Sequence, residues 1–221
     1  MELEPDGLGV AAVLQDCEHE RTRAARPPQR PWRLMWADLH VMWRSMGGPE
    51  AGIRILGIVG SLGARSSNLT LLETAASVAP DGIEVLLYTR LGELPYFDPD
   101  IDPDDAPPAV RALRQAIAAS DAVLIAAPEY GHSLPGVLKN GIDWLIGSGE
   151  LERKVVAITA SVPHSERGRQ GLAALRQTLG AVRAVIVSDE PIVRGSTSEA
   201  TMWNVLRRLV DGVRETRRRS G

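Results

Sequence analysis

From Ile53 onward, short apolar runs alternate with segments of helical periodicity, and this alternation restricts the fold more than any other feature of the chain. The runs are rich in aliphatic and β-branched residues, as expected of strands buried on both faces of a parallel sheet. The segments between them carry apolar residues three or four positions apart, which is typical of amphipathic helices. The predicted strands cover residues 53–59, 83–89, 122–126, 154–160 and 184–188. The chain is therefore predicted to be α/β, a doubly wound, five-stranded parallel sheet with helices on both faces.

The predicted helices separate the strands along the chain, which fits the flavodoxin-like strand order 2-1-3-4-5. They cover residues 68–79, 137–146, 168–179 and 199–218, together with a helix opened by Pro107 and Pro108. In such sheets, ligands bind beyond the carboxyl ends of the strands, where the winding direction switches. The loops after the first, third and fourth strands are therefore the expected binding region.

The composition excludes several classes of protein. With 221 residues, 44% of them apolar, the chain is large enough for a compact domain. Cys17 is the only cysteine, so the chain has no internal disulfide and no four-thiolate zinc site. A formal charge of −3 gives no general attraction for nucleic acid. The sequence has neither an export signal nor an apolar run of the roughly 20 residues that cross a bilayer, so we expect a cytoplasmic protein without a membrane partner.

Metal and hydrolase sites are not predicted. The four histidines, His19, His40, His132 and His164, lie far apart in the sequence. The acidic run at residues 98–105 lacks the glycine and the terminal glutamate of a calcium loop. We interpret it as a solvated loop, with a lid or substrate-entry role as the alternative. The Gly-x-Ser-x-Gly turn of α/β-hydrolases is also missing from the sequence.

Residues 1–52 differ in composition from the remainder, residues 53–221, which we take as the folded domain. An Arg-Pro stretch precedes Trp32, Trp36 and Trp43, whose spacing allows them to share one helix face. We interpret this segment as an irregular or loosely packed extension, with a specific interaction role as the alternative. A start at Met46 is a further alternative.

The loop after the first strand, residues 60–68, has the composition of an anion cradle. Small residues allow several backbone N–H groups to converge, and the start of the following helix adds partial positive charge. The side chains that would add donors or charge are Ser61, Arg65, Ser66, Ser67 and Asn68. Neither the Gly-Lys-Ser/Thr motif of triphosphate loops nor the Gly-x-Gly-x-x-Gly spacing of dinucleotide folds occurs here. The alternative is a polar turn before a helix capped by Ser66 or Asn68.

The loop after the third strand carries a more specific pattern. It reads Pro-Glu-Tyr-Gly-His-Ser-Leu-Pro-Gly from Pro128, and Val-Leu-Lys-Asn-Gly-Ile-Asp-Trp follows up to Trp144. This segment resembles the NADPH-dependent FMN reductase family of flavodoxin-like flavoproteins, whose pattern is Pro-Glu-Tyr-Asn-x-Ser-x-Pro-Gly-x-Leu-Lys-Asn-x-x-Asp-Trp. The family's phosphate loop, Gly-Ser-Leu-Arg-x-x-Ser-x-Asn, aligns with the first loop. The resemblance spans roughly residues 53 to 190.

The resemblance implies a role for residues of all three loops. Ser61, Ser66 and Asn68 fall at the family's FMN-phosphate positions, with Arg65 and Ser67 beside them. The second loop implies contacts along the flavin ring from Pro128, Glu129, Tyr130, Gly131 and Ser133. The third loop, with Ser161 and His164, would close over the pyrimidine side, and a helix starting near Gly168 would point its N-terminus at that edge.

Two positions depart from the family pattern. Gly63 replaces the arginine of the phosphate loop, with Arg65 two places further on, and Gly131 replaces the asparagine after Tyr130. The resemblance also implies that Asp143 and Trp144 shape the second loop and a subunit interface.

The function implied by the resemblance is an FMN-dependent oxidoreductase with NADPH or NADH as co-substrate. The flavin carries the chemistry, so no catalytic side chain is predicted. The electron acceptor would be a small molecule such as free flavin, a quinone, an azo or nitro compound, or a metal oxyanion, and the assembly would be a homodimer or homotetramer. The alternatives are a flavodoxin-type electron carrier and an FMN-binding protein without reductase activity.

Overall fold

A five-stranded parallel sheet forms the centre of the molecule. The computed structural model describes residues 52–63, 65–195 and 198–220, so the predicted extension and its tryptophans lie outside the described residues. The sheet has the order β2-β1-β3-β4-β6. Its strands are β1 (Ile53–Val59), β2 (Ile83–Tyr88), β3 (Ala122–Ala126), β4 (Val155–Thr159) and β6 (Val185–Ser188). Because β6 is the fifth strand of this sheet, the predicted flavodoxin-like order is confirmed.

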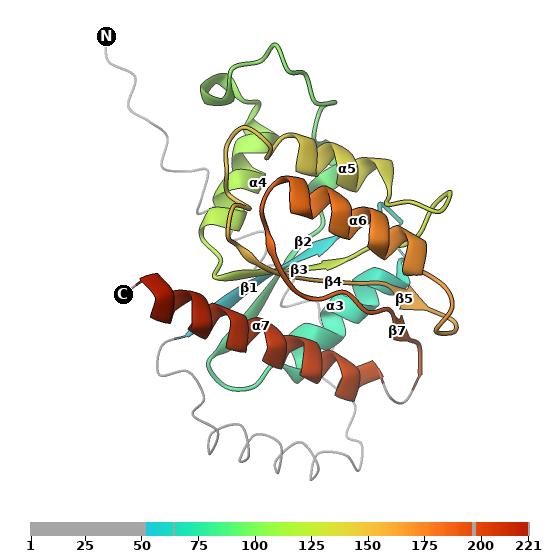
Figure 1. Cartoon of the computed structure of the whole chain (residues 1–221). Helices are drawn as coiled ribbons and strands as arrows, with labels where there is room; N and C mark the ends of the chain where they lie inside the picture. Colours follow the sequence, from blue (N-terminus) through green and yellow to red (C-terminus); the bar gives the residue numbers. More distant parts are fainter. Residues whose placement is uncertain (1–51, 64, 196–197, 221) are drawn as a thin grey trace.

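Helices cover both faces of the sheet (Figure 1). One face carries α3 (Ser67–Val78) and α7 (Ser198–Ser220), and the other carries α4 (Pro108–Ala118), α5 (Gly136–Asp143) and α6 (Arg169–Ala181). Strand β3 shows how the sheet divides the core, because neighbouring side chains point to opposite faces. Val123 and Ile125 pack in the layer under α4, α5 and α6, whereas Leu124 packs in the layer under α3 and α7.

The structure contains elements that the sequence pattern did not predict. A second, two-stranded parallel ladder pairs β5 (Ser161–Val162) with β7 (Ile192–Val193). Two residues are too few to produce a recognisable alternation of apolar and polar side chains. Within the acidic run interpreted as a solvated loop, Pro103–Asp105 forms the short 3₁₀ helix η2, and another, η1 (Arg90–Glu93), follows β2. Helix α5 ends at Asp143 and gives way to turns, so the predicted end at residue 146 was too late.

Two features are absent from the described residues. None of their helices combines the length and the apolar character that a membrane crossing requires. Their His, Cys, Asp and Glu side chains form no group of three or more that could hold a metal ion.

Candidate functional site

The three loops predicted to form the site lie together at the carboxyl ends of β1, β3 and β4. We call residues 60–66 the first loop, 127–135 the second loop and 160–168 the third loop. Backbone hydrogen bonds join their starting points: Gly60 N–H donates to Ala126 O at 2.8 Å, and Ala127 N–H donates to Thr159 O at 3.0 Å. A Cβ on Gly60 would lie 2.6 Å from Ala127 Cβ, so only glycine permits this approach of the first loop to the second.

Hydroxyl groups organise the first loop around the start of α3. Ser66 is the N-cap of this helix, and its Oγ accepts a hydrogen bond from Asn68 N–H at 3.2 Å. The same Oγ lies 2.5 Å from Ser61 Oγ, and Ser66 N–H donates to Gly63 O at 3.0 Å. Ser67 is half-buried and Arg65 is exposed. The helix cap expected from Ser66 is therefore present, and it brings Ser61, Ser66 and Ser67 to one helix N-terminus.

Asn68, in the first turn of α3, connects this helix to the third loop. Its side chain is buried, and its Oδ1 accepts a hydrogen bond from Ser161 N–H at 2.8 Å. This oxygen fixes the start of β5. The phosphate contact predicted for Asn68 would use its Nδ2 as donor and stays a prediction. The spacing of 93 residues between the two partners gives no sequence signal for this contact.

The second loop contains a tight hairpin turn. Tyr130 and Ser133 exchange two backbone hydrogen bonds of 3.0 Å, and the two residues between them, Gly131 and His132, have φ angles of +56° and +60°. Two positive φ angles in a two-residue hairpin correspond to a type I′ turn, for which glycine and asparagine are the favoured residues. Gly131 therefore preserves the backbone shape that an asparagine would allow at this position. The turn leaves Tyr130 exposed at the rim of the second loop.

Glu129 joins the second loop to helix α6. Its Oε2 accepts a hydrogen bond from Gly171 N–H at 3.0 Å, and its Oε1 lies 3.4 Å from His132 Nδ1. The hydrogen bond from the Gly171 backbone lowers the pKa of Glu129 from its ordinary value of 4.5. Burial raises this pKa in part, and His132 lowers it further. A Cβ on Gly171 would lie 3.0 Å from Glu129 Cβ, so the helix and the loop are in close contact here.

A hollow of about 330 Å³ separates the second loop from the third. We call it the crevice. Its walls include Pro128, Glu129 and Gly131 on one side and Ser161, Val162 and Gly168 on the other. Gly168 caps α6 with a φ of +83°, and a Cβ there would lie 2.9 Å from Val162 Cγ1. The predicted residue His164 is exposed on the third loop.

The segment from Pro95 to Ala106, here called the strap, is fixed to α5 at its start. Pro95 O accepts hydrogen bonds from Asn140 Nδ2 and from Trp144 Nε1, both at 2.9 Å. Phe97 N–H donates to Asn140 Oδ1 at 2.8 Å, and the Phe97 ring meets Trp144 edge-on at 5.2 Å. Trp144 thus positions the strap within the same chain. Asp143 forms an ion pair with Lys139 at 2.6 Å. The subunit-interface role of Asp143 and Trp144 stays a prediction.

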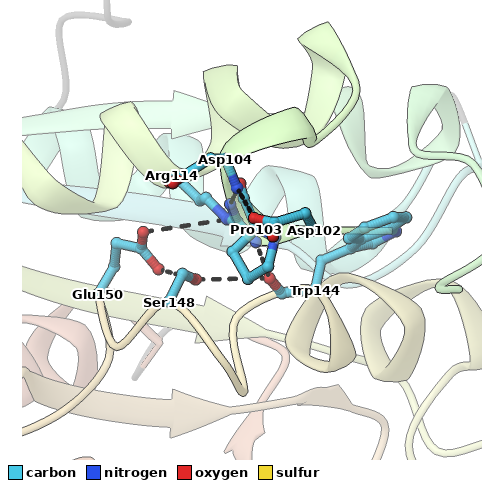
Figure 2. A network of polar contacts seen from close by, with 7 residues as sticks. All are labelled: Asp102, Pro103, Asp104, Arg114, Trp144, Ser148 and Glu150. Atoms are coloured by element: carbon cyan, nitrogen blue, oxygen red, sulfur yellow. Dashed lines mark hydrogen bonds and ion pairs between the residues drawn. The ribbon is translucent and has the colours of Figure 1, made fainter. Parts of the chain in front are cut away.

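Arg114 holds the far end of the strap, as Figure 2 shows. Its Nη1 donates to Pro103 O at 2.7 Å and its Nη2 donates to Trp144 O at 2.9 Å. Glu150 lies 4.0 Å from Arg114 Nε and accepts a hydrogen bond from Ser148 Oγ at 2.5 Å. Because both ends are hydrogen-bonded to the domain, the acidic run is part of an anchored surface segment. The lid or substrate-entry role stays a prediction.

A larger hollow, of about 600 Å³, lies at the opposite edge of the sheet. Its charged residues already pair with one another: Arg217 Nη2 lies 2.6 Å from Asp121 Oδ1, and Arg54 Nε lies 3.3 Å from Glu84 Oε2. It is bordered by the amino ends of β1 and β2, whereas ligands of doubly wound sheets bind at the carboxyl ends. The crevice is therefore the better candidate site despite its smaller volume.

Comparison with known proteins gives consistent matches over the described domain. The profile of the NADPH-dependent FMN reductase family matches residues 53–198. An NAD(P)H-dependent FMN reductase of Pseudomonas aeruginosa is 40% identical over 131 residues, covering 58% of this chain and 69% of that protein. A quinone reductase of Escherichia coli is 32% identical over 146 residues, covering 65% of this chain and 78% of that protein. A 2-hydroxy-1,4-benzoquinone reductase of a Burkholderia species is 42% identical over 92 residues, covering 42% of this chain and 49% of that protein.

One solved structure supports the same fold. The flavoenzyme NAD(P)H:(acceptor) oxidoreductase FerB of Paracoccus denitrificans superposes with a TM-score of 0.61 at 24% identity, covering 74% of this chain and 98% of that chain. At this identity the likeness concerns the architecture alone.

Proposed function

The chain belongs to the NADPH-dependent FMN reductase family, and we propose that it passes a hydride from NAD(P)H to bound FMN and then reduces a small acceptor. Membership of this family implies the use of FMN and NAD(P)H. The observation that carries the proposal is the position of the crevice. It lies between the second and third loops, at the carboxyl edge where a doubly wound sheet binds its ligand.

The residues at this edge fit a phosphorylated planar cofactor. The hydroxyls of Ser61 and Ser66 meet at the N-terminus of α3, and Ser67 is the first residue of this helix. A helix N-terminus favours an anion through its N–H groups and its dipole. Arg65 is exposed beside them and supplies positive charge in place of the arginine replaced by Gly63. The crevice provides the adjoining space for a ring system.

Each loop has a separate task in this proposal. The first loop and the start of α3 would bind the phosphate through Ser61, Arg65, Ser66, Ser67 and the side-chain N–H groups of Asn68. Pro128, Glu129, Tyr130, Gly131 and Ser133 would align the flavin from the second loop, with Ser161 and His164 facing it from the third. Asn68 would fix the spacing of the first and third loops through its bond to Ser161. Bound FMN supplies the two-electron chemistry itself, so the protein's contribution is binding, orientation and exclusion of water.

We propose a quinone as the first acceptor to test. Two of the relatives are named quinone reductase and 2-hydroxy-1,4-benzoquinone reductase, which supports this choice over azo compounds, nitro compounds and metal oxyanions. Free flavin is the second choice, because the Pseudomonas relative is named an FMN reductase. NAD(P)H and the acceptor would occupy the site in turn, each stacking on the same exposed face of the flavin ring.

We also propose a cytoplasmic homodimer or homotetramer. Apolar side chains are exposed on the strap and beyond α5, where Tyr96 is 92% exposed, Phe97 40% and Ile146 59%. Exposed apolar groups of this size favour a protein interface when they lie together. Light scattering of the purified protein tests this point, and a monomer would contradict it.

The decisive experiment is an absorption spectrum of the purified full-length protein before and after anaerobic addition of NADPH. We expect a yellow flavin band that bleaches within the mixing time and returns when benzoquinone is added. A flavin band that NADPH fails to bleach would favour an electron carrier, and a colourless protein that binds no added FMN would contradict the proposal.

A paired substitution tests the phosphate site. Ser66→Ala removes a hydroxyl that the proposal places at the phosphate, and each lost hydrogen bond to a charged group costs about 1.5–3 kcal/mol. We therefore expect FMN binding to weaken at least tenfold in a fluorescence titration. Ser77→Ala is the matched control, because Ser77 is exposed and bonds only within α3, to Thr74 O. Equal affinity of the two variants would place the phosphate elsewhere.

A further inference from the structure

The first turn of α6 is already bound to a negative charge from the second loop. Gly171 is the third residue of this helix, so its N–H has no partner within the helix. Glu129 Oε2 accepts a hydrogen bond from this group at 3.0 Å. A helix N-terminus carries about half a positive charge, so a carboxylate at this distance neutralises much of it.

The contact between Glu129 and Gly171 is largely sheltered from solvent and closely packed. The Glu129 side chain is only 19% exposed, and glycine at position 171 is what allows its Cβ and Cγ to lie against the helix. The low pKa of Glu129 means that the carboxylate stays ionised at neutral pH. The loop and the helix are therefore joined by packing as well as by a hydrogen bond.

Glu129 also lines the crevice, together with two other ionisable groups. His132 lies 3.4 Å from its Oε1, with an imidazole 74% exposed to solvent, and Arg167 stands on the third loop, also exposed. Solvent screens exposed charges more strongly than sheltered ones. The fixed negative charge of Glu129 is therefore the one most strongly felt inside the crevice.

We propose that Glu129 is a positioning residue that clamps the second loop to α6 and, by its charge, favours oxidised over reduced FMN. This inference rests on the proposed function. The reduced cofactor carries more negative charge at its pyrimidine edge than the oxidised one, and protein charge near that edge shifts the equilibrium between them. The N-terminus of α6, predicted to point at that edge, would stabilise this charge by its own partial positive charge. Glu129 counteracts this effect and keeps the bound cofactor a stronger reductant towards the acceptor.

The charge is tested with Glu129→Gln, which keeps an oxygen acceptor for Gly171 N–H but removes the negative charge. We expect the ratio of reduced to oxidised FMN affinity to rise about tenfold, which corresponds to ~30 mV for a two-electron couple. The measurement is a redox titration of the holoprotein against a reference dye. Glu152→Gln is the matched control, because Glu152 is exposed and pairs with Arg183 just before β4, at the opposite edge of the sheet. A potential for Glu129→Gln equal to that of the control overturns the proposal.

The clamp is tested separately by amide hydrogen exchange without FMN. Glu129→Ala should increase exchange at Gly171 and Leu172, whereas Glu129→Gln should exchange like the wild type. Exchange that does not change in Glu129→Ala overturns the clamp. If the wild-type protein binds no FMN, the proposed function fails, but the exchange result still decides whether Glu129 holds the helix.

Discussion

Asn68 Oδ1 accepts a hydrogen bond from Ser161 N–H at 2.8 Å, and through this contact the first turn of α3 holds the start of β5. The asparagine is 3% exposed, so water cannot easily replace the bond. The start of α3 and the third loop are therefore held at a fixed spacing by one side chain.

Replacing Asn68 with alanine should destabilise the fold. The change leaves the Ser161 N–H without its acceptor, which costs roughly 1–3 kcal/mol for a buried group. Asn68→Asp retains an oxygen at the same position and should lose less. Urea unfolding measures both, with Asn204→Ala on the exposed side of α7 as a control expected within about 0.5 kcal/mol of the wild type. Equal stability of Asn68→Ala and the control would show that the contact contributes nothing.

Two glycines of α6 should respond in opposite ways to alanine. In a helix, alanine is favoured over glycine by about 1 kcal/mol. At Gly180 a Cβ meets nothing within 4 Å, so Gly180→Ala should stabilise the protein by up to that amount. At Gly171 a Cβ would lie 3.0 Å from Glu129 Cβ and 3.1 Å from its Cα, so Gly171→Ala should be destabilising. Thermal unfolding compares the pair, and a stabilising Gly171→Ala would mean that the second loop moves away at little cost.

Trp144→Phe should loosen the strap. The variant loses the Nε1–H bond to Pro95 O and some buried ring volume, for a cost of at least about 1 kcal/mol. Chymotrypsin, which cleaves after aromatic residues, should then cut faster at Tyr96 and Phe97. Tyr96→Phe is the control, because this side chain is 92% exposed and the ring remains available for cleavage. Cleavage of Trp144→Phe at the wild-type rate would show that the remaining contacts of the strap hold it in place without the Trp144 hydrogen bond.

Acid should remove the stabilising contribution of Glu129. The pKa of this carboxyl is below 4.5 in the folded protein, because the charged form accepts the Gly171 N–H bond. The unfolded chain therefore binds more protons near this pH, and stability rises with pH there. The contribution is fully present above pH 4.5 and is lost as the pH falls through the folded-state pKa. Urea unfolding between pH 7 and pH 3 should show a smaller acid loss for Glu129→Gln than for the wild type. Parallel curves of stability against pH for the two proteins would show that ionised Glu129 does not stabilise the fold.

The sequence was most informative where burial is complete. Strands β1 and β3 were predicted with their observed bounds, because their residues are almost all buried and give continuous apolar runs. The ladder of β5 and β7 was missed, because two residues per strand carry no pattern. Pro128 and Tyr130 belong to a recognisable motif, yet the hydrogen bond from Gly171 N–H to Glu129 depends on how the second loop packs on α6, 42 positions away. Local patterns do not contain that information.

The turn at Gly131 and His132 has a consequence for anyone who wishes to redesign the acceptor preference of this protein. Left-handed backbone at both positions admits glycine, asparagine, aspartate or histidine readily and disfavours β-branched side chains. Random libraries at these two codons would therefore contain many destabilised variants. Diversity is better directed at Tyr130, whose side chain is 60% exposed and whose φ angle is not in the left-handed region.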